Sequence, residues 1–112
     1  MWQEVRRFVS RIYKITEKQF GRDFGLRDQL RRAAVSILLN ISEGFERASN
    51  IDFARFINQA KASAGECRAV FYIAFDNRYL EEEQFNELKS DSLNISRQLA
   101  KFGIFSISSH KK

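Results

Sequence analysis

The stretch RRAAVSILLNISEGFER, residues 31–47, decides the fold class because it combines an apolar helical period with polar residues at the same spacing. Apolar side chains such as Ala33 and Ile37 recur every three or four residues, which is the pattern of a helix with one buried face. Val35 and Leu39 lie on another side of this helix. The stretch therefore predicts a helix that is apolar on more than its core-facing side.

The polar residues within this stretch share one stripe of the predicted helix, and we interpret them as a packing and assembly seam rather than a reactive site. Glu43 lies four residues before Arg47 and pairs most simply with it. Val35 and Leu39 fit an oligomer in which a neighbouring subunit covers the helix. The predicted seam comprises Arg32, Val35, Ser36, Leu39, Asn40, Glu43 and Arg47.

The rest of the chain repeats the helical pattern. Its 112 residues include no proline and five glycines, so long helices are permitted and a turn-rich β-sandwich is disfavoured. Four periodic segments separated by short breaks predict an all-α fold, an antiparallel up-down four-helix bundle in one domain spanning 1–112. The predicted helices are 2–20, 26–47, 50–77 and 81–102. The tail 103–112 is expected either to fray or to pair with a partner chain.

Local signals mark the helix starts. Ser49 and Asp52 have the spacing of a capping box at the start of the third helix. Asp28 is expected near the N-terminus of the second helix, where a negative charge suits the helix dipole. The segment Glu81–Glu83 is interpreted in the same way for the fourth helix. The apolar seam of that last helix is predicted to comprise Phe85, Leu88, Ser92, Ile95, Leu99 and Phe102.

The charge of the chain is unevenly distributed. The formal net charge is +5, and residues 5–32 hold nine basic side chains against three acidic ones. Four of these cations share one stripe of the first helix, and three more follow at the helix end and in the second helix. A polyanion is the candidate partner, although a basic surface can also serve solubility alone. The predicted nucleic-acid-binding residues are Arg7, Arg11, Lys14, Lys18, Arg22, Arg27 and Arg31.

Candidate catalytic residues are sparse, and we expect no enzyme activity, no metal and no cofactor. The chain has one histidine, His110, and no HxxxH, CxxC or GxxxxGK[ST] pattern. Arg97 is too far from His110 to form the Arg and His pair of small helical ribonucleases. Cys67 falls on the core face of the third helix, where a thiol behaves as a small apolar group. Glu43 with an arginine in an open polar pocket would revive a hydrolase hypothesis.

The compartment is expected to be cytoplasmic. The start MWQEVRRF lacks the apolar core of a secretory signal, and one cysteine cannot form an internal disulfide. No stretch approaches the roughly 18 consecutive apolar residues of a membrane span. We therefore expect no membrane partner.

A longer stretch carries a family resemblance. FGLRDQLRRAAVSILLNISEGFER, residues 24–47, resembles the four-helix-bundle proteins encoded in intervening sequences of bacterial 23S rRNA genes. FGL, RRAAVSI and N-I-[SA]-E-G match in order and spacing. The chain departs at Leu38 and Leu39, where relatives usually have Pro-Ser, and at Arg27, where they often have a capping Thr. The resemblance continues through Ser49, Phe53, Phe56, Ala60, Glu66, Tyr79 and Leu80.

The resemblance implies an antiparallel four-helix bundle that assembles into a homopentameric ring. Such a ring is similar to that of the accessory variability determinant protein of diversity-generating retroelements, which presents a basic surface and is understood to bind nucleic acid and a reverse transcriptase. Together with the basic stripe, this predicts a non-enzymatic homo-oligomer that binds RNA or DNA with little sequence specificity. The alternative is a protein-interaction scaffold whose partner is another protein.

Overall fold

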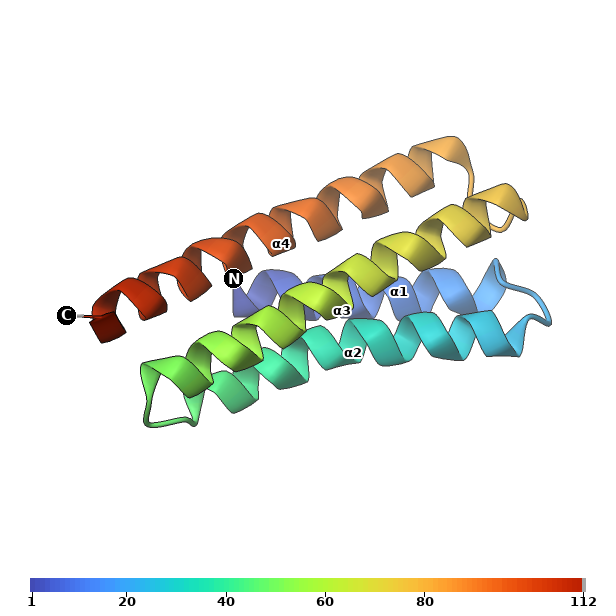
Figure 1. The fold of residues 1–112 in the computed structure, drawn as a ribbon. Coiled ribbons are helices and arrows are strands. Elements are labelled where there is room, and N and C mark those ends of the chain that lie inside the picture. The colour runs from blue at the N-terminus through green and yellow to red at the C-terminus, as the bar shows by residue number, and fades with distance from the viewer. Residues whose placement is uncertain (112) are drawn as a thin grey trace.

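The structure is a computed structural model that describes the backbone of residues 1–111 and the side chains of residues 1–103. Four helices follow one another as α1 (Trp2–Lys18), α2 (Phe24–Phe45), α3 (Asn50–Asp76) and α4 (Glu82–Lys111). Successive helices run antiparallel and form a rod of 50 × 21 × 20 Å (Figure 1). The predicted all-α four-helix bundle is confirmed.

The order of the helices around the bundle follows the order of the chain. α3 packs against both α2 and α4, and α2 also packs against α1. α1 lies behind α3 in the view of Figure 1, so these two helices are diagonal to each other. The outer faces of α1 and α3 consequently point to opposite sides of the molecule.

The core is built from the apolar faces that the helical periods predict. The Phe8 ring of α1 meets the Phe71 ring of α3 edge-on, with ring centroids 6.2 Å apart. Burying one such large side chain contributes about 1.5–3 kcal/mol. Phe102 of the predicted α4 seam is instead 40% exposed. The largest fully buried side chains are Phe20, Phe71, Ile12, Leu30, Ile37, Ile41, Ile57, Leu88, Ile95, Leu99, Val5 and Thr16.

The capping signals are confirmed at α3 and wrong at α2. The Ser49 hydroxyl accepts the backbone N–H of Asp52 at 3.1 Å, as the capping box predicts. The α2 cap is Asp23, whose carboxylate accepts the backbone N–H of Leu26 at 3.1 Å. Asp28 lies beyond the first turn and pairs with the Arg27 side chain instead. The second helix therefore begins at Phe24 rather than at residue 26.

The fourth helix does not end at residue 102, because its backbone stays helical to Lys111. Gly103 is buried, and a Cβ placed on it would lie 3.8 Å from side-chain atoms of Ile57 and Asn58 in α3. This glycine therefore packs inside the helix and does not end it. The predicted tail is helical in its backbone, and its side chains beyond Gly103 lie outside the described residues.

The two loops at one end of the bundle are joined to each other. The Tyr79 hydroxyl donates a hydrogen bond to the Asp23 carboxylate, and its ring packs on Phe20 with centroids 5.4 Å apart. α3 ends in a Schellman motif, in which Tyr79 N–H bonds Ala74 C=O and Arg78 has a φ of 64°. The α1–α2 and α3–α4 connections are thereby fixed at the same end.

Candidate nucleic-acid interface

The outer face of α1 carries cations around a shallow hollow of about 480 Å³. Arg7 and Lys14 are exposed on this face, and their side chains have no carboxylate partner among the described residues. No acidic residue lines the hollow, whose lining consists of Gln3, Arg6, Arg7, Ser10, Arg11 and Lys14. This face can therefore hold an anion without displacing an internal partner.

Arg11 differs from the other cations of the predicted stripe because it joins α1 to α4. Its guanidinium bonds Glu87 at 2.5 Å and Asp91 at 3.0 Å. Each of its terminal nitrogens contacts a different carboxylate. The charge of Arg11 is thus already compensated, and this residue marks the α4 edge of the basic surface.

Arg27 and Arg31 are also engaged within the chain. Arg27 pairs with Asp28 and lies over the Phe24 ring, 4.7 Å from its centroid. Arg31 donates to the Thr16 hydroxyl at 2.9 Å and lies over a tyrosine ring of α1. Arg27 thus contacts other residues of α2, and Arg31 contacts α1. The predicted nucleic-acid-binding residues that are exposed are Arg7, Lys14, Lys18 and Arg22.

The acidic cluster at the start of α4 lies at the same end of the bundle as Arg22. Glu82 and Glu83 occupy the first turn of α4, as predicted. The backbone N–H of Glu81 donates to the side-chain carbonyl of Gln84, which completes the cap. Among the described side chains, these glutamates form no ion pair.

The polar stripe of α2 runs along its boundary with α3. The Asn40 amide donates to the Ser36 backbone and hydroxyl, and Ser63 of α3 donates to the same hydroxyl at 3.0 Å. Glu43 forms the predicted ion pair with Arg47. These contacts account for the stripe as packing within one chain.

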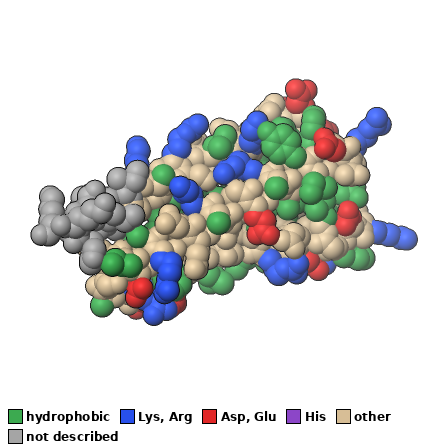
Figure 2. Space-filling model, in the orientation of Figure 1, with side chains coloured by type: hydrophobic (Ala, Val, Ile, Leu, Met, Phe, Trp, Pro, Cys, Tyr) green, Lys and Arg blue, Asp and Glu red, His purple; other side chains and the backbone are tan. Residues whose placement is uncertain are grey.

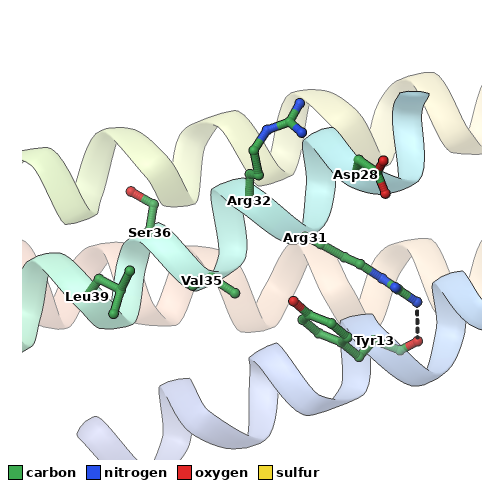
Figure 3. A pocket seen from close by; sticks show the side chains of 7 residues that line it. All are labelled: Tyr13, Asp28, Arg31, Arg32, Val35, Ser36 and Leu39. Atoms are coloured by element: carbon green, nitrogen blue, oxygen red, sulfur yellow. Dashed lines mark hydrogen bonds between the residues drawn. The ribbon is translucent and has the colours of Figure 1, made fainter. Parts of the chain in front are cut away.

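The apolar residues of the seam lie apart from this stripe. Val35 and Leu39 point to the same side of α2 as Tyr13 of α1, while Arg32 and Ser36 point to the other side (Figure 3). Leu39 is 62% exposed. Together these five side chains, with Asp28 and Arg31, line a hollow of about 580 Å³. This hollow is the apolar surface that the sequence predicts on α2.

Cations on α3 and α4 form a second basic surface that the sequence interpretation missed. The cations of the first helix were predicted to form a surface because they follow one helical period. The cations of the second surface are divided between two helices, so no single period reveals them. One feature of the sequence indicates this second surface, namely that residues 92–101 include no Asp or Glu. These cations are Lys61 and Arg68 of α3 and Lys89, Arg97 and Lys101 of α4, and the Arg68 guanidinium contacts Ser92 and Ser96 of α4.

The cysteine and the histidine are the two groups of the chain that were considered for chemistry. Cys67 is fully buried, and its burial raises the pKa of the thiol to about 12. Among the described residues, no three His, Cys, Asp or Glu side chains are placed to hold a metal ion. His110 lies outside the described side chains. Within the described part of the chain, no helix combines the length and apolarity needed to cross a membrane.

Comparison with known proteins decides the family. The model of the 23S rRNA-intervening sequence protein family matches residues 1–101. The chain belongs to this family. A similar solved structure is that of a protein of unknown function from the S23 ribosomal protein family of Bacteroides thetaiotaomicron, with a TM-score of 0.82 and 25% sequence identity. The match covers 91% of this chain and 96% of that chain. No curated protein matches this chain significantly.

Proposed function

We propose that this 23S rRNA-intervening sequence protein binds RNA or DNA through the outer face of α1 and catalyses no reaction on it. The observation that carries the proposal is the hollow on α1, which is lined by arginine and lysine and by no carboxylate. Neutralising phosphates with such side chains releases condensed counterions, and this release supplies most of the affinity of non-specific binding.

The same face supports binding with little sequence specificity. Its polar groups are long, flexible cations with neutral Gln3 and Ser10 between them. The Trp2 ring at the start of α1 is partly covered by Arg6 and donates its indole N–H to Ser42. Contacts to phosphates fix the position of a nucleic acid but carry no sequence information. We therefore expect affinities that depend strongly on salt and weakly on sequence.

The test replaces the two unpaired cations of the hollow in the variant Arg7→Gln/Lys14→Gln. Loss of two phosphate contacts should lower the affinity for every sequence and reduce the slope of log K against log[salt] by about 1.8 for duplex DNA. Fluorescence anisotropy across a salt series measures both quantities.

The control variant for this test is Arg55→Gln/Arg78→Asn, which removes the same charge from exposed positions on α3 and its loop. An unchanged affinity and slope in Arg7→Gln/Lys14→Gln would contradict the proposal. Retention of another protein in a pull-down after nuclease treatment would favour the scaffold alternative.

Self-assembly through α2 is a second candidate function, and the exposed Leu39 supports it. Leu39 and Val35 lie beside Tyr13 on a hollow that one chain does not fill. A second copy placed against this face would remove the apolar surface from water. The stoichiometry that we propose is the homopentameric ring implied by the family resemblance.

Light scattering tests the assembly with the variant Leu39→Glu. The charge should be tolerated in the monomer, because Leu39 is mostly exposed there, but it should block an apolar interface. The expected molar mass is that of one chain. Ile51→Glu is the matched control at an exposed apolar position of α3, and it should keep the wild-type mass. Equal masses for Leu39→Glu and the wild type would exclude an interface at this position.

A further inference from the structure

The face formed by α3 and α4 is strongly basic, and its cations have no acidic partners. We call Lys61, Arg68, Lys89, Arg97 and Lys101 the α3–α4 basic face. None of the five forms an ion pair with a described side chain. Figure 2 shows Lys and Arg side chains gathered over α3 and over the part of α4 towards its C-terminal end. This surface is separate from the outer face of α1, which meets α4 through the bonds of Arg11 to Glu87 and Asp91.

The carboxylates nearest to this face in the sequence are turned towards other helices. Glu66 accepts a hydrogen bond from Gln29 of α2. Asp91 accepts one from Arg11 of α1. Glu66 is thereby held on the side of α3 that faces α2, and Asp91 on the side of α4 that faces α1. Neither Glu66 nor Asp91 therefore pairs with a cation of the α3–α4 basic face.

Arg68 is held rigidly at the centre of this face by neutral groups. Its Nη1 donates to the Ser96 hydroxyl at 2.8 Å and to the Ser92 carbonyl at 3.2 Å. Its Nη2 lies 3.5 Å from the position that a Cβ on Gly65 would take, so no side chain of residue 65 covers it. A half-buried guanidinium with fixed geometry and remaining N–H donors suits a phosphate oxygen as its charged partner.

An aromatic ring accompanies the cations. Tyr72 is 46% exposed and packs edge-on against Phe85, with ring centroids 5.0 Å apart. The Lys89 ammonium lies over the Tyr72 ring, 5.3 Å from its centroid, so a base that stacks on this face of the ring would take the place of the ammonium. A ring fixed by a core neighbour and next to cations is the combination on which proteins stack the bases of single strands.

We propose that the α3–α4 basic face is a second nucleic-acid contact that holds a single strand, with phosphates at Lys61, Arg68 and Arg97 and a base stacked on Tyr72. This inference rests on the proposed function of nucleic-acid binding and adds a contact outside the outer face of α1. The ring distinguishes the occupant from an acidic protein, which would need the cations but no stacking surface.

The first test compares the exposed double variants Lys61→Gln/Arg97→Gln and Arg7→Gln/Lys14→Gln with the control Arg55→Gln/Arg78→Asn. The probes are labelled oligouridine and oligothymidine, measured by anisotropy across a salt series. Loss of two phosphate contacts at Lys61 and Arg97 should reduce the salt slope by about 1.4 for a single strand. The control should retain the wild-type slope.

The second test uses the ring. Tyr72→Leu should weaken oligouridine binding roughly tenfold, whereas Tyr72→Phe should retain it, because stacking needs the ring and not the hydroxyl. Thermal melts establish that each variant is folded. If Tyr72→Leu does not fold, the Lys61→Gln/Arg97→Gln result decides the proposal. Polyglutamate is the acidic-polypeptide competitor, and it should displace oligouridine poorly.

The outcomes separate this inference from the proposed function. Weaker binding in Lys61→Gln/Arg97→Gln supports the α3–α4 basic face, whether or not Arg7→Gln/Lys14→Gln also binds more weakly. Weaker binding in Arg7→Gln/Lys14→Gln alone overturns the α3–α4 contact and keeps the one on α1. Binding that neither variant alters overturns both. Equal binding by folded Tyr72→Leu, or efficient displacement by polyglutamate, overturns the single-strand assignment.

Discussion

Tyr79 is the residue through which the two loops at one end of the bundle are connected. Its hydroxyl donates to the Asp23 carboxylate, which also caps α2. This hydrogen bond, with smaller effects of burial and of the negative charge of Asp23, raises the pKa of Tyr79. A raised pKa means that the folded chain binds the phenolic proton more tightly than the unfolded chain.

The connection predicts a pH-dependent effect of Tyr79→Phe. The hydrogen bond stabilises the wild type fully below the ordinary tyrosine pKa of about 10, and this stabilisation is lost as pH rises through the higher folded pKa. The variant should therefore melt at a lower temperature than the wild type at neutral pH, and the gap should shrink above pH 10. Thermal melts at a series of alkaline pH values measure the gap, and a constant gap would contradict the assignment.

Sequence spacing predicted single residues well where their partners are local. Ser49 with Asp52 and Glu43 with Arg47 are three or four residues apart, and both pairs form. Arg11 is different, because its partners in α4 follow 76 and 80 residues later. A helical period gives the side of a helix on which a cation lies, but it does not give the charges of the helix beside it.

At the scale of helices, Gly44 sets how closely α2 approaches α3. A Cβ built on Gly44 would lie 3.3 Å from the Phe56 Cβ and 3.5 Å from the Phe53 ring. The Phe56 Cβ is fixed to its backbone and cannot rotate away. Gly44 is buried on the core face of α2.

This approach predicts opposite effects for two Gly→Ala substitutions. Gly65→Ala should stabilise the fold by about 1 kcal/mol, because the helix propensity of alanine is gained and the nearest atom, Nη2 of Arg68, lies at an ordinary contact distance of 3.5 Å. Gly44→Ala gains the same propensity but overpacks α2 against α3, at a cost of about 1–3 kcal/mol. Urea unfolding at one protein concentration measures the two free energies. A stabilised Gly44→Ala would contradict the close approach.

The helix ends show where sequence patterns reach their limit. Asp23 precedes α2 and Asp28 lies within it, and either carboxylate could cap a helix. Only the turn geometry of the preceding loop selects Asp23. Gly103 resembles a helix terminator in sequence, but it is buried against α3 and lies inside α4. The loop geometry decides the first boundary and the packing against α3 decides the second, and neither is visible in a local window of sequence.

At the scale of the whole molecule, three surfaces point in different directions. The α1 hollow lies on the first helix, the α3–α4 basic face lies on the last two, and the exposed Leu39 lies on α2 beside Tyr13 of α1. The four-helix order was predictable from four periods and short loops, but the α3–α4 basic face was not, because it exists only once α3 and α4 are paired.

The link between Arg11 and α4 has a consequence for the order of folding. The main helix contacts join α1 to α2, α2 to α3 and α3 to α4, so they close short loops and favour fast folding. Arg11 instead connects residues from the two ends of the chain, and we expect its bonds to form after the main barrier. Arg11→Gln should then raise the unfolding rate and leave the folding rate unchanged. Stopped-flow kinetics in urea measure both rates, and a slower folding rate would place this contact in the folding nucleus.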